Sequence, residues 1–160
     1  MKNIKIEFKW AIIFTIMSML WILLESITGL HDEYIEYHPI YTNLYAIPAI
    51  LVYVLALRDK KYNFFNGQIS FKQIFISGLV LSLIIALFAP LSTFVSVEYL
   101  SPDFFDNAIS KSVELEMMTQ VEANEYFNTS SYMLQSLMFA PIFGIITTLV
   151  VGIFLRSKSK

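Results

Sequence analysis

The sequence predicts an all-α integral membrane four-helix bundle, with an additional amphipathic helix between spans three and four on the outer face. Hydrophobic residues make up 56% of the chain and charged residues only 15%, whereas an average soluble domain has about 25% charged residues. The apolar residues gather in four runs close to the roughly 20 residues that a helix needs to cross a bilayer. We therefore expect one membrane domain over residues 1–160.

The four predicted spans differ in the signals that bound them. They cover approximately residues 10–30, 39–57, 71–97 and 132–155. The second is the weakest, because it must begin at Pro39 to be long enough, and Pro48 should kink it. Ser70, after the turn pair Asn66 and Gly67, is placed to cap the third. The lysines before the first run resemble a signal peptide, but the run is long and lacks an alanine-type cleavage site, which favours an uncleaved anchor.

Basic residues are strongly segregated along the chain. Three lie before the first span, four between spans two and three, and three after the fourth, which places ten of the eleven on one side. The opposite side holds only Lys111 against ten acidic residues. By the positive-inside rule, both termini should lie in the cytoplasm. An even number of spans is required for this arrangement.

Small residues mark the expected helix-packing faces. Lipid is as apolar as leucine, so membrane helices associate through close backbone approach and buried polar contacts. The predicted fourth span carries Ala140, Gly144, Thr148 and Gly152 at successive i+4 positions, and the third carries Gly78, Ser82, Ala86 and Pro90. We expect these two stripes to pack together, within one chain or between two.

Glu25 is the one charged residue expected inside a span. A carboxylate in the bilayer is costly, so an intramembrane acid is by default a functional candidate. Glu25 lies about one and a half turns from the outer end of its helix, where it could instead reach interfacial water. Both interpretations stay open, a structural or snorkelling role and a proton or ion site.

The segment between spans three and four predicts the outer helix, over approximately residues 102–125. Ser101, Pro102 and Asp103 have the order of a helix start, with a cap, a proline and an acid near the positive end of the dipole. The residues that follow have a broad apolar side, so the helix could lie on the membrane or cap the bundle.

Both histidines of the protein lie on the first outer loop, at His31 and His38, among several acids. Seven residues on a helix separate them by about two turns, roughly 10 Å, too far to share an ion without help from a loop. We therefore expect no metal site, with His31 and His38 as weak candidates.

No catalytic group or cofactor site is visible in the sequence. There is no cysteine, and the five glycines are too scattered to form a phosphate-binding loop. We expect no enzyme activity, no cofactor and no nucleic-acid partner. The leading hypothesis is a structural or interaction role in the lipid bilayer, as a homo-oligomer or with a membrane partner subunit. The alternative is a small transporter or channel, proton-linked through Glu25.

Two stretches carry a family resemblance. Gly67-Gln68-Ile69-Ser70-Phe71, followed by Gly78 within an apolar run, and then Glu98-Tyr99-Leu100-Ser101-Pro102-Asp103-Phe104 resemble the bacterial membrane family known as domain of unknown function 4199. The resemblance covers nearly the whole chain. It implies four spans with an acidic helical segment between the third and fourth, and a place in a bacterial inner membrane. It implies no activity or site residue.

Overall fold

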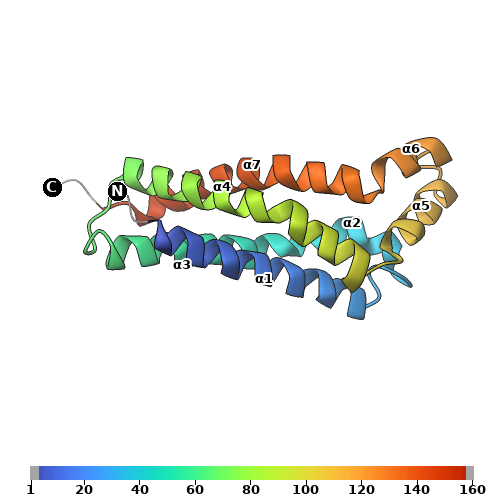
Figure 1. Cartoon of the computed structure of the whole chain (residues 1–160), viewed down its shortest axis with the longest axis horizontal. Helices are drawn as coiled ribbons and strands as arrows, with labels where there is room; N and C mark the ends of the chain where they lie inside the picture. The colour runs from blue at the N-terminus through green and yellow to red at the C-terminus, as the bar shows by residue number, and fades with distance from the viewer. Residues whose placement is uncertain (1–3, 158–160) are drawn as a thin grey trace.

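The computed structural model describes residues 4–157 and is an elongated bundle of helices (Figure 1). Four stretches are long and apolar enough to cross a membrane: Lys5–Ile27, Ile35–Asn63, Phe71–Leu100 and Thr129–Leu155. The predicted fold class is therefore confirmed. The elements are α1 (Lys5–Ile27), η1 (Ile35–Tyr37), α2 (His38–Tyr41), η2 (Thr42–Tyr45), α3 (Ala46–Asn63), α4 (Phe71–Val95), η3 (Ser96–Leu100), α5 (Phe104–Glu114), α6 (Gln120–Tyr126) and α7 (Thr129–Leu155).

Neighbouring residues explain where α4 begins and where the second long stretch is interrupted. Ser70 caps α4, because its hydroxyl accepts from the Gln73 N–H while the Gln73 side chain accepts from the Ser70 N–H. The second long stretch is interrupted at η2, a short 3₁₀ segment next to Pro48. Proline lacks the N–H that would bond the carbonyl four residues earlier, so the α-helical pattern changes there.

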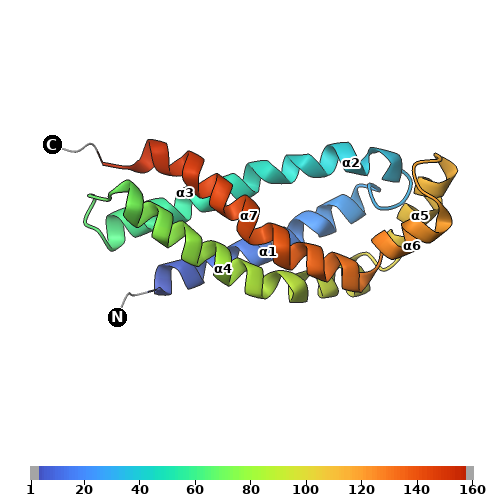
Figure 2. The same ribbon diagram turned by 90° about the horizontal axis from the view of Figure 1, so that it is seen from above.

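The two ends of the bundle differ in charge. The lysine-rich end carries the α3–α4 turn together with Lys9, Lys60, Lys61 and Lys72, and the opposite, acidic end carries α5 and α6 (Figures 1 and 2). Lys2, Lys158 and Lys160, which the charge count included, lie outside the described residues. At the lysine-rich end, the Ser157 N–H donates to the Ile69 carbonyl at 2.9 Å and joins the end of the chain to the start of α4.

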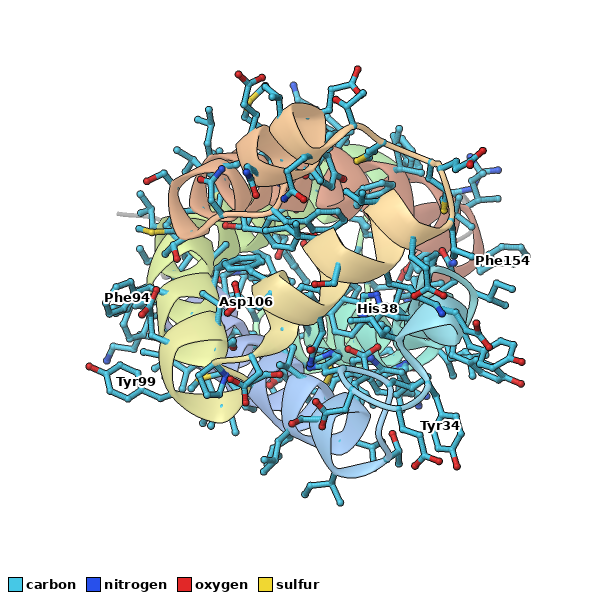
Figure 3. The ribbon with its side chains drawn as sticks, turned by 90° about the vertical axis from the view of Figure 1, so that its right-hand side faces the viewer. Tyr34, His38, Phe94, Tyr99, Asp106 and Phe154 are labelled. Carbon is cyan, nitrogen blue, oxygen red and sulfur yellow. The ribbon has the colours of Figure 1, made fainter. Side chains whose placement is uncertain are left out.

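The outer segment has two helices rather than one. After α5 ends at Glu114, Glu116 adopts a φ of 55°, and the chain turns before α6 begins. The prediction of one helix over 102–125 was therefore wrong in extent, because a left-handed residue cannot continue an α-helix. The helix α5 lies across the acidic end of the bundle as a cap (Figure 3). Its start is also different from the prediction, since Asp103 is the N-cap and Ser101 makes no capping bond.

Candidate functional site

The small residues lie where α4 and α7 approach most closely. A Cβ atom added to Gly78 would lie 2.2 Å from Thr148 Oγ1, and one added to Gly144 would lie 2.3 Å from Ser82 Oγ. Gly152 faces Phe71 and Ile74 with more room, at 3.1 and 3.2 Å. The two stripes therefore face each other within one chain. Ala86 is buried, and Ala140 packs against the neighbouring apolar cluster.

Polar groups in this seam are satisfied locally. The hydroxyl of Ser82 donates to the Gly78 carbonyl at 2.7 Å, and that of Thr148 donates to the Gly144 carbonyl at 2.7 Å. Tyr53 Oη lies 2.9 Å from Ser82 Oγ and ties α3 to the pair. Burial raises the cost of losing any of these bonds.

Glu25 is the centre of a buried cluster at the acidic end. Its carboxylate oxygen Oε2 lies 3.5 Å from His31 Nε2 and 3.9 Å from His38 Nε2. The other oxygen, Oε1, accepts from Trp21 Nε1 at 2.7 Å, one turn earlier on the same helix. Glu25 is only 4% exposed, so it does not reach solvent as a snorkelling residue would.

The loop after α1 brings both histidines to this carboxylate. Gly29 has a φ of 80°, and the Tyr34 N–H donates to its carbonyl at 2.8 Å, which turns the chain back on itself. His38 then opens α2. The two imidazole rings lie 5.2 Å apart, and Phe104 of α5 packs against both. The expected separation of roughly 10 Å was wrong, because it assumed one continuous helix through both residues.

Residues far away in the sequence close the cluster. Ser101 Oγ lies 2.7 Å from His31 Nδ1, so this serine contacts the histidine instead of capping a helix. Asn107 of α5 donates to the His31 carbonyl at 2.9 Å and to Asp32 Oδ1 at 3.0 Å. Sequence reasoning missed both contacts. The proximity of Glu25, His31 and a turn-forming Gly29 was the only sequence signal that could have indicated the cluster.

Sequence reasoning also missed a second buried charge, at the lysine-rich end. Because α1 begins at Lys5 rather than near Trp10, Glu7 lies inside the bundle. Its carboxylate is 2.9 Å from Lys60 Nζ and accepts from Ser77 Oγ at 2.6 Å. Next to it, Lys9 and Trp10 both donate to Asp59. These contacts join α1, α3 and α4.

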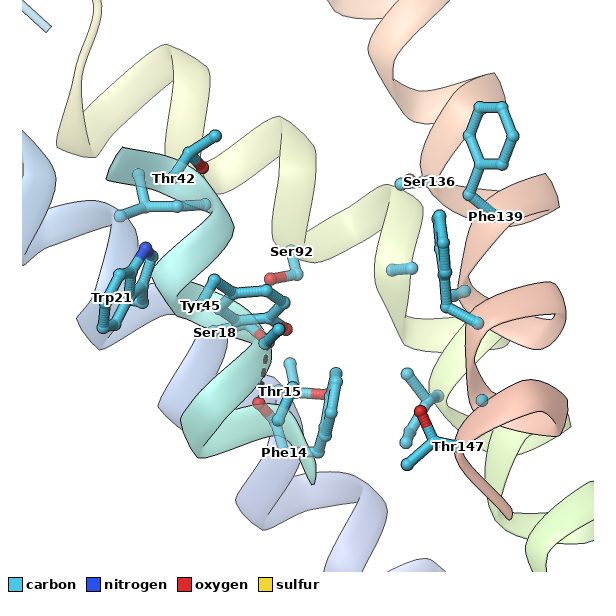
Figure 4. A pocket seen from close by; sticks show the side chains of 18 of the residues that line it. Phe14, Thr15, Ser18, Trp21, Thr42, Tyr45, Ser92, Ser136, Phe139 and Thr147 are labelled. Carbon is cyan, nitrogen blue, oxygen red and sulfur yellow. Dashed lines mark hydrogen bonds between the residues drawn. The ribbon is translucent and has the colours of Figure 1, made fainter. Parts of the chain in front are cut away.

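A cavity of about 620 Å³ lies between α1, η2, α3, α4 and α7 (Figure 4). Its wall is mostly apolar, and Glu25 and Trp21 line it on the side of the acidic end. Its hydroxyl groups come from all four long stretches: Thr15, Ser18, Thr42, Tyr45, Tyr53, Ser92, Thr93, Ser136 and Thr147. Ser18 and Tyr45 bond to each other at 2.6 Å across the α1–η2 contact (Figure 4). This size and lining are typical of small-molecule sites.

These features define a helical membrane protein that has a cavity in its bundle and a buried acid–histidine cluster beside the cavity. The chain belongs to the family described as protein of unknown function DUF4199, whose sequence profile matches residues 9–157. No curated protein and no solved structure matches the chain.

Proposed function

We propose that this protein is a non-enzymatic membrane protein that binds a neutral amphiphile, with a hydroxyl head group and a hydrocarbon body, in the cavity of its bundle. The observation that carries the proposal is the cavity of about 620 Å³ with its largely apolar wall and scattered hydroxyl groups. A ligand of this kind would enter from the lipid. Ten of eleven cations lie on one side of the predicted membrane segments, which supports a bacterial inner-membrane orientation with both termini in the cytoplasm.

The lining favours a hydrogen-bond donor on the ligand. Thr15 and Ser136 already donate to the backbone carbonyls of Ala11 and Met133, at 2.9 Å each. A hydroxyl that has used its hydrogen keeps its oxygen lone pairs and can still accept. No lysine or arginine is among the cavity-lining residues of the described chain, so an anionic head group would find no cation there. An alcohol would satisfy the free acceptors without a charge.

The test uses Trp21, which lines the cavity, as a reporter. In the Trp10→Phe background, 12-bromododecan-1-ol should quench Trp21 fluorescence in detergent saturably, and at lower concentration than 12-bromododecanoic acid. Ala89→Phe, which fills the cavity, should raise the concentration for half-quenching at least tenfold. The matched control is Leu87→Phe on the same helix, which is 76% exposed toward lipid and should change nothing.

Equal quenching by the alcohol, the acid and a brominated phospholipid would mean that lipid chains alone occupy the cavity, and it would overturn the proposal. If Ala89→Phe does not give a monodisperse protein, Ala49→Leu blocks the same cavity from α3. Unchanged quenching in a folded blocking variant would equally count against an alcohol site.

A structural role and a carrier role remain proposals. The faces of Gly144 and Gly78 are covered within the chain, so association with a second copy or partner subunit would have to use lipid-facing surfaces. Cross-linking in native membranes tests for such a complex. A carrier would use the same cavity and release its ligand on the other side, which a liposome flux assay measures. Proton coupling through Glu25 stays a prediction from the sequence.

A further inference from the structure

We propose that Glu25, His31 and His38 form a site for a divalent transition-metal ion of the zinc type, placed under the capping helix α5. One donor atom from each residue lies within 4.8 Å of the other two, and Glu25 and His31 are buried. Two imidazoles with one carboxylate are a common ligand set for zinc with a fourth position left open. The site shares Glu25 with the wall of the cavity but does not require that the cavity hold a ligand.

Two of the three donor separations are close to those of an occupied site, and all three are within 4.8 Å. With metal–ligand bonds of about 2.0–2.2 Å, tetrahedral geometry places donor atoms roughly 3.3 Å apart. The observed separations from Glu25 Oε2 are 3.5 Å to His31 Nε2 and 3.9 Å to His38 Nε2. Small side-chain rotations would close the set. The His38 side chain is 20% exposed, which gives it room to move and leaves a route for the ion from the acidic surface.

On Glu25 and His31, the polar atoms that would not bind the metal already have partners. Trp21 Nε1 donates to Glu25 Oε1 at 2.7 Å, and Ser101 Oγ lies 2.7 Å from His31 Nδ1. When Nδ1 carries the ring hydrogen and donates to Ser101, Nε2 presents its lone pair toward the carboxylate. In that tautomer both atoms are acceptors, so a cation between them would be bound by both. Such orienting contacts are usual around bound zinc.

Ring packing holds the ligands in this arrangement. Phe104 lies 4.6 Å from the His31 ring and 5.1 Å from the His38 ring, measured between centroids. Asn107 fixes the backbone of His31 from α5. A metal ion would therefore link α1, the loop after it and α2 beneath the cap.

The experiment is equilibrium dialysis of the full-length protein in detergent, with its affinity tag removed, against buffered free Zn²⁺. We expect one ion per chain, with nitrogen and oxygen ligands including imidazole in X-ray absorption at the zinc edge. Glu25→Gln, His31→Gln and His38→Gln should each lower affinity by at least about 100-fold. The matched control is Glu33→Gln, an exposed acid on the same loop, which should leave affinity unchanged.

Ser101→Ala keeps all three ligands and tests the orienting contact. It should weaken zinc binding by about 10- to 100-fold, the usual effect of removing a group that orients a metal ligand. This variant also keeps the proposal falsifiable if a histidine variant does not fold. Equal binding by Glu25→Gln and the unmodified protein would assign the ion to surface acids, and absence of binding at micromolar free zinc would overturn the site. Neither result bears on alcohol quenching of Trp21, so the two proposals fail separately.

Discussion

Gly144 offers the sharpest test of how α4 and α7 pack. In Gly144→Ala the new methyl group would lie 2.2 Å from Tyr53 Oη and 2.3 Å from Ser82 Oγ. Both neighbours are buried and bonded to each other at 2.9 Å. Neither side chain can move away without losing that bond or separating the two helices.

The magnitude follows from two contributions. Adding a methyl group to a filled interior costs about 1–3 kcal/mol, and the upper part of that range applies because two groups are displaced. Loss of one hydrogen bond between membrane helices adds about 0.6 kcal/mol. The gain in helix propensity from glycine to alanine largely cancels, since a membrane helix stays helical in denaturing detergent. The free energy of unfolding should therefore fall by about 2–4 kcal/mol.

The assay is unfolding of the purified protein in mixed micelles with increasing dodecyl sulfate, followed by tryptophan fluorescence and circular dichroism. Gly152→Ala is the matched control, because its added methyl would meet Phe71 and Ile74 at 3.1 and 3.2 Å. These neighbours need to yield only slightly, and we expect a cost of about 1 kcal/mol or less. Equal destabilisation by the two substitutions would show that the contact at Gly144 does not hold α4 against α7.

Three further predictions concern the ends of the helices and the buried ion pair. Lys60→Met should lower the free energy of unfolding by about 3–5 kcal/mol, because it leaves Glu7 buried without its cation; adding Glu7→Gln should restore much of the loss in the same unfolding assay. Ser70→Ala should lower the free energy of unfolding by about 1 kcal/mol, because it removes the cap of α4. Ser157→Ala removes the hydroxyl that accepts from the Ile69 N–H, and its effect on the same free energy shows whether this contact stabilises the protein as much as the cap does. Hydrogen bonds from Thr119 hold the pKa of Glu122 below its ordinary 4.5. The carboxylate therefore stabilises α6 above that value, and the protection factors of α6 amides, which correct for the pH dependence of intrinsic exchange, should fall as the pH falls through the lowered pKa.

Hydropathy was sufficient to predict the four long helices, because a bilayer imposes a length of about 20 apolar residues on each. The cap at Ser70 was also predictable, since its partner Gln73 is only three residues away. The extent of α1 was not, because the apolar run used to predict the first span begins near Trp10, after Glu7. Its burial depends on Lys60, and no local sequence pattern predicts a partner 53 residues away.

The acid–histidine cluster could not be predicted from the sequence for a similar reason. Helical spacing placed His31 and His38 far apart, whereas the turn that begins at Gly29 and the 3₁₀ segment η1 after it bring their rings to 5.2 Å. The sequence order at Ser101 suggested a helix cap, but its hydroxyl instead reaches His31, 70 residues away. Short-range rules predict how a helix starts, whereas contacts between loops are decided by how the helices beneath them are arranged.

The buried carboxylates of Glu7 and Glu25 differ in the groups that face them. Glu7 faces the ammonium group of Lys60 and the hydroxyl of Ser77, so its charge is compensated by the chain itself. Glu25 faces two imidazoles, whose ring nitrogens are common metal ligands. A metal ion next to Glu7 would be repelled by the Lys60 ammonium group, whereas next to Glu25 three donor atoms already lie close together. The proposed binding of a metal ion at the acidic end therefore rests on histidine, rather than lysine, as the partner of a buried acid.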